Sequence, residues 1–312
     1  MTHDDKWGAI ACLVGAMLCY SAVPIFLRFF IKNEAMDPWA VNALRYSMGA
    51  LFWAPAVLVL TRRRKAEDGP APSRSVWRDA LVPSAVNLVG QSFYGVSPAY
   101  VSAPTIGFVI RLSFLFTLLF GFLFIAEERR LARRPAFLAG AMLCVAGLVT
   151  MFVERLAAEG TASVTGLLIL LVSTLGWGGY AVAVRKRMAG YPVRLSFGVI
   201  SLYTWAGLVV LSHLFGRPAS LGCLSAGLWA ALIVSGLIGV TFSHVMYYRG
   251  IHRLGPVVSS GVLMATPFIT YAGAAVLLGE VLTRTQLLGG IAVVAGGVSL
   301  VMARGQVEAR VH

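Results

Sequence analysis

Ten long apolar blocks dominate this sequence and constrain its fold more than any other feature. Each block spans about 20 residues, the length that an α-helix needs to cross roughly 30 Å of hydrocarbon. Only 12% of the 312 residues are charged and 58% are apolar, which is far too much apolar surface for a soluble domain of this size. The blocks lack the alternation of a membrane β-barrel, so an all-α polytopic membrane protein is expected. The expected helices cover residues 8–31, 39–61, 79–97, 104–126, 135–153, 164–184, 195–215, 226–248, 255–279 and 285–303.

The basic residues are distributed unevenly among the segments that join these blocks. Of the 26 Lys and Arg residues, 19 lie in segments on the N-terminal side of the membrane, four lie in segments on the other side, and three lie within helices. The positive-inside rule then places both termini in the cytoplasm. This pattern accounts for the net charge of +13, so we expect no nucleic-acid partner. The N-terminus lacks a basic n-region, and we expect the first block to remain as a helix rather than be cleaved as a signal peptide.

The two halves of the chain resemble each other. Pro104 is followed 24 residues later by Glu128, and Pro256 is followed 24 residues later by Glu280, so the two pairs are related by an offset of 152. Each half holds five helices, and because five is odd the second half enters the membrane from the opposite side. Such an inverted 5+5 repeat is typical of secondary transporters, which hold substrate near the midplane where the halves meet. The expected repeats are residues 8–153 and 164–303.

The end of the second half carries a longer motif. Residues 279–290 read Gly-Glu-Val-Leu-Thr-Arg-Thr-Gln-Leu-Leu-Gly-Gly, with Gly296-Gly297 after them and Pro267 before them. This run resembles the end of an EamA domain, and Arg45 in the second helix has an equivalent in many members. The first half carries a weaker copy that keeps Glu128. The resemblance covers almost the whole chain as two EamA units and implies the drug/metabolite transporter superfamily, with most similarity to the YddG-type exporters of aromatic and other neutral amino acids.

A polar stripe marks the third expected helix. Ser84, Asn87, Gln91 and Tyr94 are spaced so that they share one face of a helix. Amides and a phenol that face lipid would be costly, so the stripe should face protein or a water-filled cavity. We interpret Asn87, Gln91 and Tyr94 as lining a substrate cavity, and hydrogen bonds between helices are the alternative.

Arg111 lies inside the fourth expected helix, about 10 Å from its outer end at 1.5 Å per residue. An arginine at this depth must be paired or solvated, and its planar fork of donors suits a substrate carboxylate. The alternative is a structural arginine that donates to backbone carbonyls. At the offset of 152, the face that carries Arg111 corresponds to Ser259 and Thr266 in the ninth helix. We therefore expect these two residues to face the same cavity.

Aromatic residues add to this candidate site. Tyr20 and Trp177 occupy matched positions in the first helices of the two halves. They could stack on an aromatic substrate or cover an ammonium group, although ordinary packing remains an alternative. His244 is a further candidate, but it lies about 100° round its helix from the face that matches the polar stripe. A packing role is therefore favoured for His244.

Other residues are expected to be structural. Arg45 lies near the outer end of its helix and should cap carbonyls or a neighbouring helix end, while Glu128 and Glu280 should tie loops together at helix ends. Pro24 and Pro267 are candidate helix bends. All 13 Asp and Glu residues lie in loops, tails or at helix ends, which argues against a carboxylate proton relay.

These features predict a secondary transporter, either an exporter or a uniporter, in the inner membrane of a bacterium. Its substrates would be small amphiphilic metabolites, above all aromatic and other neutral amino acids, moved by alternating access of the two halves. One alternative is a carrier of phosphorylated or nucleotide-linked metabolites, which would need several cationic groups in the pocket. Another is a membrane scaffold that transports nothing. We expect no enzyme activity, no cofactor and no metal; the expected partners are the substrate and the bilayer, and the expected state is a monomer.

Overall fold

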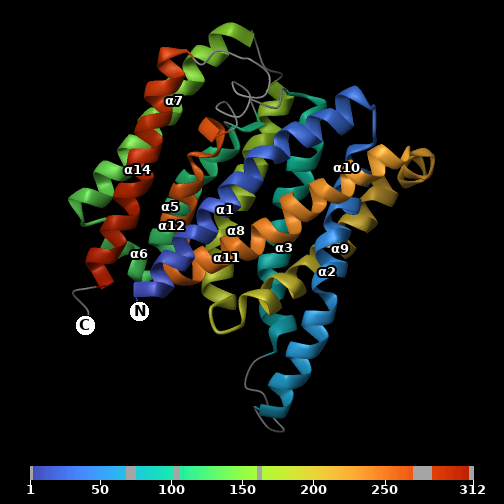
Figure 1. Cartoon of the computed structure of the whole chain (residues 1–312), viewed down its shortest axis with the longest axis horizontal. Coiled ribbons are helices and arrows are strands. Elements are labelled where there is room, and N and C mark those ends of the chain that lie inside the picture. Colours follow the sequence, from blue (N-terminus) through green and yellow to red (C-terminus); the bar gives the residue numbers. More distant parts are fainter. Residues whose placement is uncertain are drawn as a thin grey trace.

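The computed structural model describes residues 3–67, 75–101, 106–107, 109–159, 164–269 and 283–308, and every regular element in these ranges is helical (Figure 1). The expected all-α fold is therefore confirmed. The first half contains α1 (His3–Arg28), η1 (Phe29–Asn33), α2 (Pro38–Glu67), α3 (Val76–Val96), η2 (Ser97–Ala99), η3 (Ile110–Leu112), α5 (Ser113–Phe124), α6 (Ala126–Leu131) and α7 (Pro135–Glu159). The second half contains α8 (Val164–Met188), α9 (Val193–Phe215), η4 (Pro218–Cys223), α10 (Ala226–Gly236), η5 (Leu237–Phe242), α11 (Ser243–Leu254), α12 (Pro256–Leu263) and α14 (Arg284–Glu308).

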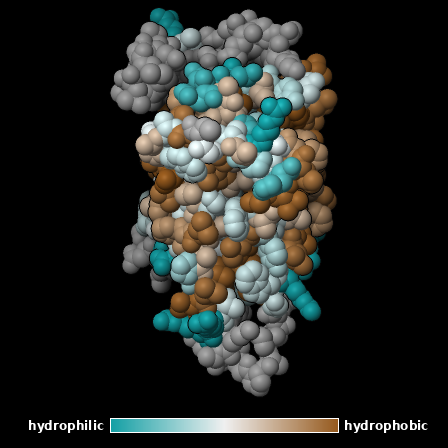
Figure 2. Space-filling view, turned by 90° about the vertical axis from the view of Figure 1, so that its right-hand side faces the viewer, coloured by the Kyte–Doolittle hydropathy of each residue, from teal (hydrophilic) through white to brown (hydrophobic). Residues whose placement is uncertain are grey.

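Several of these helices have the length and composition of membrane spans. Five stretches are long and apolar enough to cross a bilayer: Trp7–Asn33, Pro38–Arg63, Val164–Met188, Val193–Phe215 and Ala226–Leu254. Four shorter apolar helices coincide with further expected spans: Ile110–Phe124, Pro135–Thr150, Pro256–Ile269 and Leu287–Ala303. Hydrophobic residues cover the middle of the face in Figure 2, and hydrophilic residues lie toward both ends. Length and composition thus support five of the ten expected crossings, and the other five stay predictions.

The helices pair across the two halves. α7 packs along α14, and α2 packs along α9, so equivalent helices of the two repeats meet each other. α3 packs along α8, and α1 packs along α11. The repeat relates these two pairings to each other, because α1 corresponds to α8 and α3 corresponds to the helix that ends in α11. Figure 1 shows α7 and α14 side by side at one edge, with α1 beginning and α14 ending at the same end of the bundle. This arrangement fits an even number of crossings.

Glycines allow the close approach of α7 and α14. A Cβ atom added at Gly140 would lie 2.9 Å from the carbonyl oxygen of Gly296. A Cβ atom at Gly147 would lie 2.5 Å from the carbonyl oxygen of Gly289. Any side chain at these positions would therefore push the two backbones apart.

The fourth and ninth expected helices are interrupted. The expected helix 104–126 ends at Phe124, where Ile125 adopts an extended conformation with φ −125° and ψ 111°. Glu128 consequently lies in the separate short helix α6 rather than at the end of the preceding helix. In the second half, α12 ends at Leu263 and the chain is helical again at residues 266–269, while the expected end at residue 279 lies outside the described residues.

Pro267 explains the interruption of the ninth helix. Proline has no N–H, and its ring clashes with the carbonyl four residues earlier, which here belongs to Leu263. The chain turns instead through short-range bonds, in which the Met264 and Ala265 amides donate to carbonyls three residues earlier at 3.1 and 3.3 Å. By contrast, α1 and α2 continue through the prolines at 24 and 55 without a break.

Candidate functional site

Two small cavities meet at the centre of the bundle and together form what we call the central site. Their volumes are about 30 Å³ and about 10 Å³, so each holds about one water molecule or less. The larger is lined by Tyr20, Arg111, Ser113, Trp177, Tyr180, His244, Tyr247, Ser260 and Leu263. The smaller is lined by Tyr20, Val23, Arg45, Gln91, Tyr94, Arg111, Trp177, Gly239 and Val240. Residues from both halves contribute, and three of them, Tyr20, Arg111 and Trp177, belong to both cavities.

Arg111 is held by its counterpart in the other half. It lies in η3, is 7% exposed, and donates from Nη1 to the carbonyl oxygen of Leu263 at 3.2 Å. Leu263 lies 152 residues further on, which is the repeat offset. The Thr266 hydroxyl donates to the same oxygen at 2.6 Å, and the oxygen is available because Pro267 cannot donate to it. Arg111 Nε has no hydrogen-bond partner among the described residues, so one buried donor of this side chain is still unused.

Arg45 also belongs to the central site. Its Nε donates to the Ser235 hydroxyl of α10 at 2.7 Å, which is a structural contact between helices. However, the side chain is only 2% exposed, it lines the smaller cavity beside Tyr94, and its Nη2 has no hydrogen-bond partner within the described ranges. Sequence reasoning missed this second role. The available signal was an arginine inside an apolar block that holds no acidic residue.

Three aromatic residues gather around the two arginines. The ring of Trp177 lies 5.0 Å from that of Tyr94 and 6.4 Å from that of Tyr20, measured between centroids. Gly90 makes room for the indole, because a Cβ atom there would overlap it. The indole N–H is buried without a hydrogen-bond partner in the described part of the chain. The matched residues Tyr20 and Trp177 thus lie close together.

His244 combines packing with a place in the cavity wall. Its ring stacks on Phe197 at 5.1 Å between centroids and meets Tyr20 edge-on at 5.4 Å. Its Nδ1 lies 3.1 Å from the carbonyl oxygen of Val240. The side chain also lines the larger cavity, so both interpretations of His244 describe part of its surroundings.

Some predicted site residues lie elsewhere. Asn87 is fully buried and donates to the Tyr46 hydroxyl at 3.0 Å and to the Thr204 hydroxyl at 3.1 Å. It therefore joins α3 to α2 and α9, as the alternative of interhelical hydrogen bonding described, and it lines neither cavity. Gln91 and Tyr94 of the same stripe do line the smaller cavity.

The predicted polar face of the ninth helix is displaced by one residue. Ser259 is buried but lines neither cavity, whereas Ser260 lines the larger one and shares a 2.8 Å hydrogen bond with the Tyr247 hydroxyl. The Thr266 hydroxyl donates to a backbone carbonyl in its own turn. Tyr180 and Tyr247 are further lining residues that the sequence pattern did not identify.

A π-helical segment shapes the wall of the smaller cavity. η5 contributes Gly239 and Val240 to the lining. A Cβ atom at Gly239 would lie 2.7 Å from Arg45 Nη2, so glycine is needed for the guanidinium to approach. The π-helical geometry displaces backbone carbonyls from their usual partners, and the carbonyl of Thr241 accepts from the Trp53 indole at 3.0 Å. Such segments occur frequently at functional sites.

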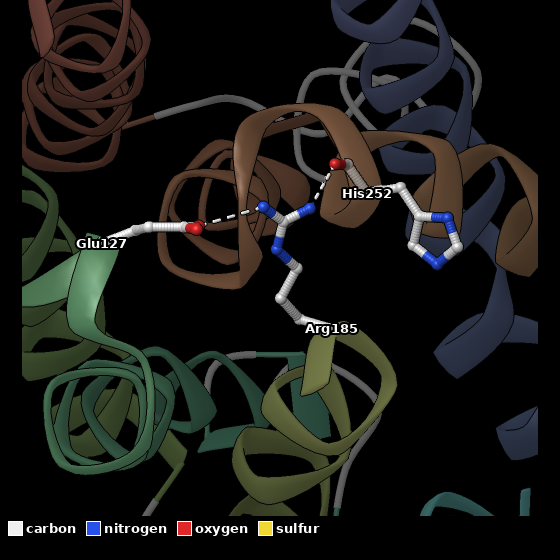
Figure 3. Close-up of polar contacts among 3 residues, drawn as sticks. All are labelled: Glu127, Arg185 and His252. Carbon is white, nitrogen blue, oxygen red and sulfur yellow. Dashed lines mark hydrogen bonds and ion pairs between the residues drawn. The ribbon is translucent and has the colours of Figure 1, made fainter. Parts of the chain in front are cut away.

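The acidic residues in the described part of the chain lie away from the central site. None of the described residues that line either cavity is Asp or Glu. Glu128 is buried in α6, and Glu280 lies outside the described residues. Glu127 of α6 pairs with Arg185 of α8 at 3.0 Å, and Arg185 also donates to the His252 carbonyl of α11 (Figure 3). Across the described ranges, no three His, Cys, Asp or Glu side chains are placed to hold a metal ion.

Known proteins resemble this chain over most of its length. The chain is 29% identical over 295 residues to the aromatic amino acid exporter YddG of Ancylobacter novellus, covering 91% of this chain and 96% of that protein. It is 23% identical over 307 residues to a WAT1-related protein of Arabidopsis thaliana, covering 89% and 81%. A crystal structure with 20% identity has the same fold, with a TM-score of 0.73 over 95% of this chain and 97% of that one.

A family of transporters also matches both halves of the chain. The EamA-like transporter family matches residues 6–153 and again residues 164–302. These two matches nearly coincide with the two halves that pair in the bundle. The chain therefore belongs to the EamA-like transporter family of the drug/metabolite transporter superfamily.

Proposed function

We propose that this protein is a secondary transporter of small amphiphilic metabolites that carry a carboxylate, above all aromatic and other neutral amino acids. Membership of a transporter family and similarity to an exporter named for aromatic amino acids support the class of activity. We further propose that it acts as an exporter or uniporter in a bacterial inner membrane, with both termini in the cytoplasm.

The observation that carries the proposal is a set of three buried donors at the central site. Arg45 Nη2, Arg111 Nε and the Trp177 indole N–H have no acceptor among the described residues. A buried donor that is left unpaired costs about 1–3 kcal/mol, so a ligand that supplies oxygen acceptors here recovers this cost. A carboxylate is the natural ligand for arginine donors.

The remaining surroundings suit the rest of an amino acid. The rings of Tyr20, Tyr94 and Trp177 offer flat apolar surface to an aromatic side chain, and their faces attract an ammonium group. The amide oxygen of Gln91 can accept from the same group. With two arginines and no acidic residue among its described lining, the site favours zwitterions and anions over cations.

The cavities are too small for an amino acid as they stand. Pockets for small molecules usually have volumes of about 300–1,000 Å³, whereas these hold roughly one water molecule. Because the lining comes from both halves, relative movement of the halves would open the site, as alternating access requires. The described conformation is therefore interpreted as a closed one.

The test is transport by the purified protein in liposomes. Labelled phenylalanine should exchange by counterflow, and competition across the 20 amino acids should rank aromatic and neutral ones first. Protein-free liposomes and liposomes with the Arg111→Ala variant are the controls. If no amino acid exchanges faster than in protein-free liposomes, the proposed substrate class is wrong.

A second candidate is favoured by Arg45 specifically. Two arginines at one site meet the requirement for several cationic groups that a phosphorylated metabolite imposes. Competition distinguishes the two candidates, because glycerol 3-phosphate should then displace the labelled substrate better than phenylalanine does. A membrane scaffold without transport activity would show exchange of neither compound.

A further inference from the structure

A third, much larger cavity lies outside the central site. It is a cleft of about 1040 Å³ at the end of the bundle where α1 begins and α11 ends. Residues of α1, α2, α9, α11 and the turn before α9 line it. They are Cys12, Pro55, Ala56, Val59, Leu60, Ala189, Tyr191, Pro192, Val193, Arg194, Val245, Met246, Arg249, His252 and Arg253.

The walls of this cleft have two distinct chemistries. Val59 and Leu60 of α2 and Val245 and Met246 of α11 line the cleft, which gives it an apolar wall. The mouth is basic, with Arg194 at the start of α9 and two arginines and a histidine in the last turns of α11. None of the fifteen lining residues is Asp or Glu. The cleft therefore suits an amphiphile with an anionic head.

The cleft and the central site lie on different faces of α11. His244 and Tyr247 line the central site, whereas Val245, Arg249 and His252 line the cleft. At about 100° per residue, the midpoint of the second group lies more than 100° round the helix from the midpoint of the first, although His252 lies only about 80° from His244. α11 therefore lies between the cleft and the central site.

The part of the cleft wall that contains His252 is held in place by contacts with α8 and α6. Arg185 donates to the His252 carbonyl and pairs with Glu127, as Figure 3 shows, so the last turn of α11 is held against α8 and α6. The imidazole of His252 points away from this contact in Figure 3. The basic mouth is thus built on a braced helix end.

We propose that this cleft binds an anionic phospholipid. The headgroup phosphate lies between Arg194 and Arg249, and an acyl chain packs on the apolar wall formed by α2 and α11. Arginine binds phosphate through paired N–H groups, and basic pockets between membrane helices typically bind anionic headgroups on the cytoplasmic side. The charge count predicts that this end of the bundle is the cytoplasmic one. A bound lipid would contact α2 of the first half and α9 and α11 of the second.

Native mass spectrometry tests the proposal directly. Purified protein is mixed with phosphatidylglycerol or with phosphatidylcholine of the same acyl chains, and retained lipid is counted. The wild type should retain phosphatidylglycerol preferentially. An Arg194→Gln/Arg249→Gln variant should lose roughly tenfold or more of that affinity. The matched control is Arg129→Gln/Arg133→Gln, which removes the same charge from exposed arginines that do not line the cleft. Equal retention by the two variants would overturn the proposal.

Further measurements separate the lipid from other ligands. Val59→Trp fills the apolar wall without a change of charge, so it should reduce retention of both lipids; unchanged retention contradicts the proposal. Soluble glycerol 3-phosphate and phenylalanine should not displace the lipid at millimolar concentration. Displacement by the former would show an aqueous anion site, and displacement by the latter would place the cleft in the transport path. Unchanged circular dichroism and elution volume of each variant show that it is folded.

Discussion

Arg111 is positioned by a backbone carbonyl oxygen that lacks its usual helical donor. Pro267 cannot donate to the Leu263 carbonyl, and Arg111 and Thr266 donate to it instead. The place of Arg111 inside an apolar block could be read from the sequence. Its partner could not, because that depends on a helix break in the other half. The place of Arg45 in the wall of the smaller cavity was not predicted either. It depends on η5, a segment of the other half that lines the same cavity.

The first prediction concerns Arg111 as the carboxylate anchor. A charge-assisted hydrogen bond contributes about 1.5–3 kcal/mol, so Arg111→Ala should weaken amino-acid binding roughly tenfold or more. Arg111→Lys should recover part of this, because it keeps the charge but loses the planar fork. Binding of phenylalanine and of its decarboxylated amine is measured in the same preparation. An equal loss for both compounds would show that Arg111 is only structural.

The second prediction concerns Trp177 as a surface for aromatic side chains. Trp177→Ala should reduce exchange of phenylalanine by several-fold more than exchange of alanine, because only the former stacks on the indole. Gly90→Ala should act in the same direction, since its methyl group displaces the indole. Trp77→Ala is the control, because Trp77 is partly exposed and contacts Tyr203 instead. Equal losses for both substrates would rule out stacking.

At the scale of elements, apolar blocks predicted the helices well and their interruptions poorly. Block length reflects the thickness of the bilayer, so it survives any detail of packing. No adjacent glycine or proline predicts the helix break at Ile125. The prediction of Ser259 rather than Ser260 comes from projecting the face of Arg111 as part of one regular α-helix, whereas Arg111 lies in the 3₁₀-helix η3, which has about 3.0 rather than 3.6 residues per turn. Helix periodicity therefore identified the correct helices for the site but not always the correct residues.

The third prediction concerns the break in the ninth helix. Pro267→Ala restores an N–H that can donate to the Leu263 carbonyl and so competes with Arg111. Melting temperature should stay the same or rise, while substrate affinity falls. Pro55→Ala is the control, because α2 already continues through that proline. A Pro267→Ala variant with unchanged affinity would separate Arg111 from the helix break.

The fourth prediction concerns the contact between α7 and α14. Gly147→Ala should destabilise the protein by about 1–3 kcal/mol, the usual cost of overpacking, because its methyl group meets the Gly289 carbonyl. Gly227→Ala is the control, since the nearest atom to its methyl group lies 3.9 Å away. Thermal unfolding in detergent measures both variants. Equal melting temperatures would show that the two helices yield easily.

At the scale of the whole molecule, each half of the inverted repeat has an arginine contact near the end of its first helix. Arg28 ends α1 and donates to the carbonyls of Pro98 and Val101 at 2.8 and 3.2 Å. Arg185, near the end of α8, donates to the carbonyl of His252. α1 and α8 are the first helices of their halves and run in opposite directions, so the same kind of contact fastens opposite ends of the bundle. This symmetry explains how two similar sequences can close one central site from both sides.

The fifth prediction concerns the orientation of the whole bundle. Single cysteines are introduced as Arg63→Cys at the end of α2 and as Ser220→Cys in η4, with the four native cysteines replaced by serine. Both positions are exposed, and α9 separates η4 from the end of the bundle that Arg63 occupies. Because 19 of the 26 basic residues lie on the side of Arg63, an impermeant maleimide should label only Ser220→Cys in intact cells and both variants after permeabilisation. The reverse pattern would invert the topology and would place the basic cleft, with its proposed lipid, in the outer leaflet.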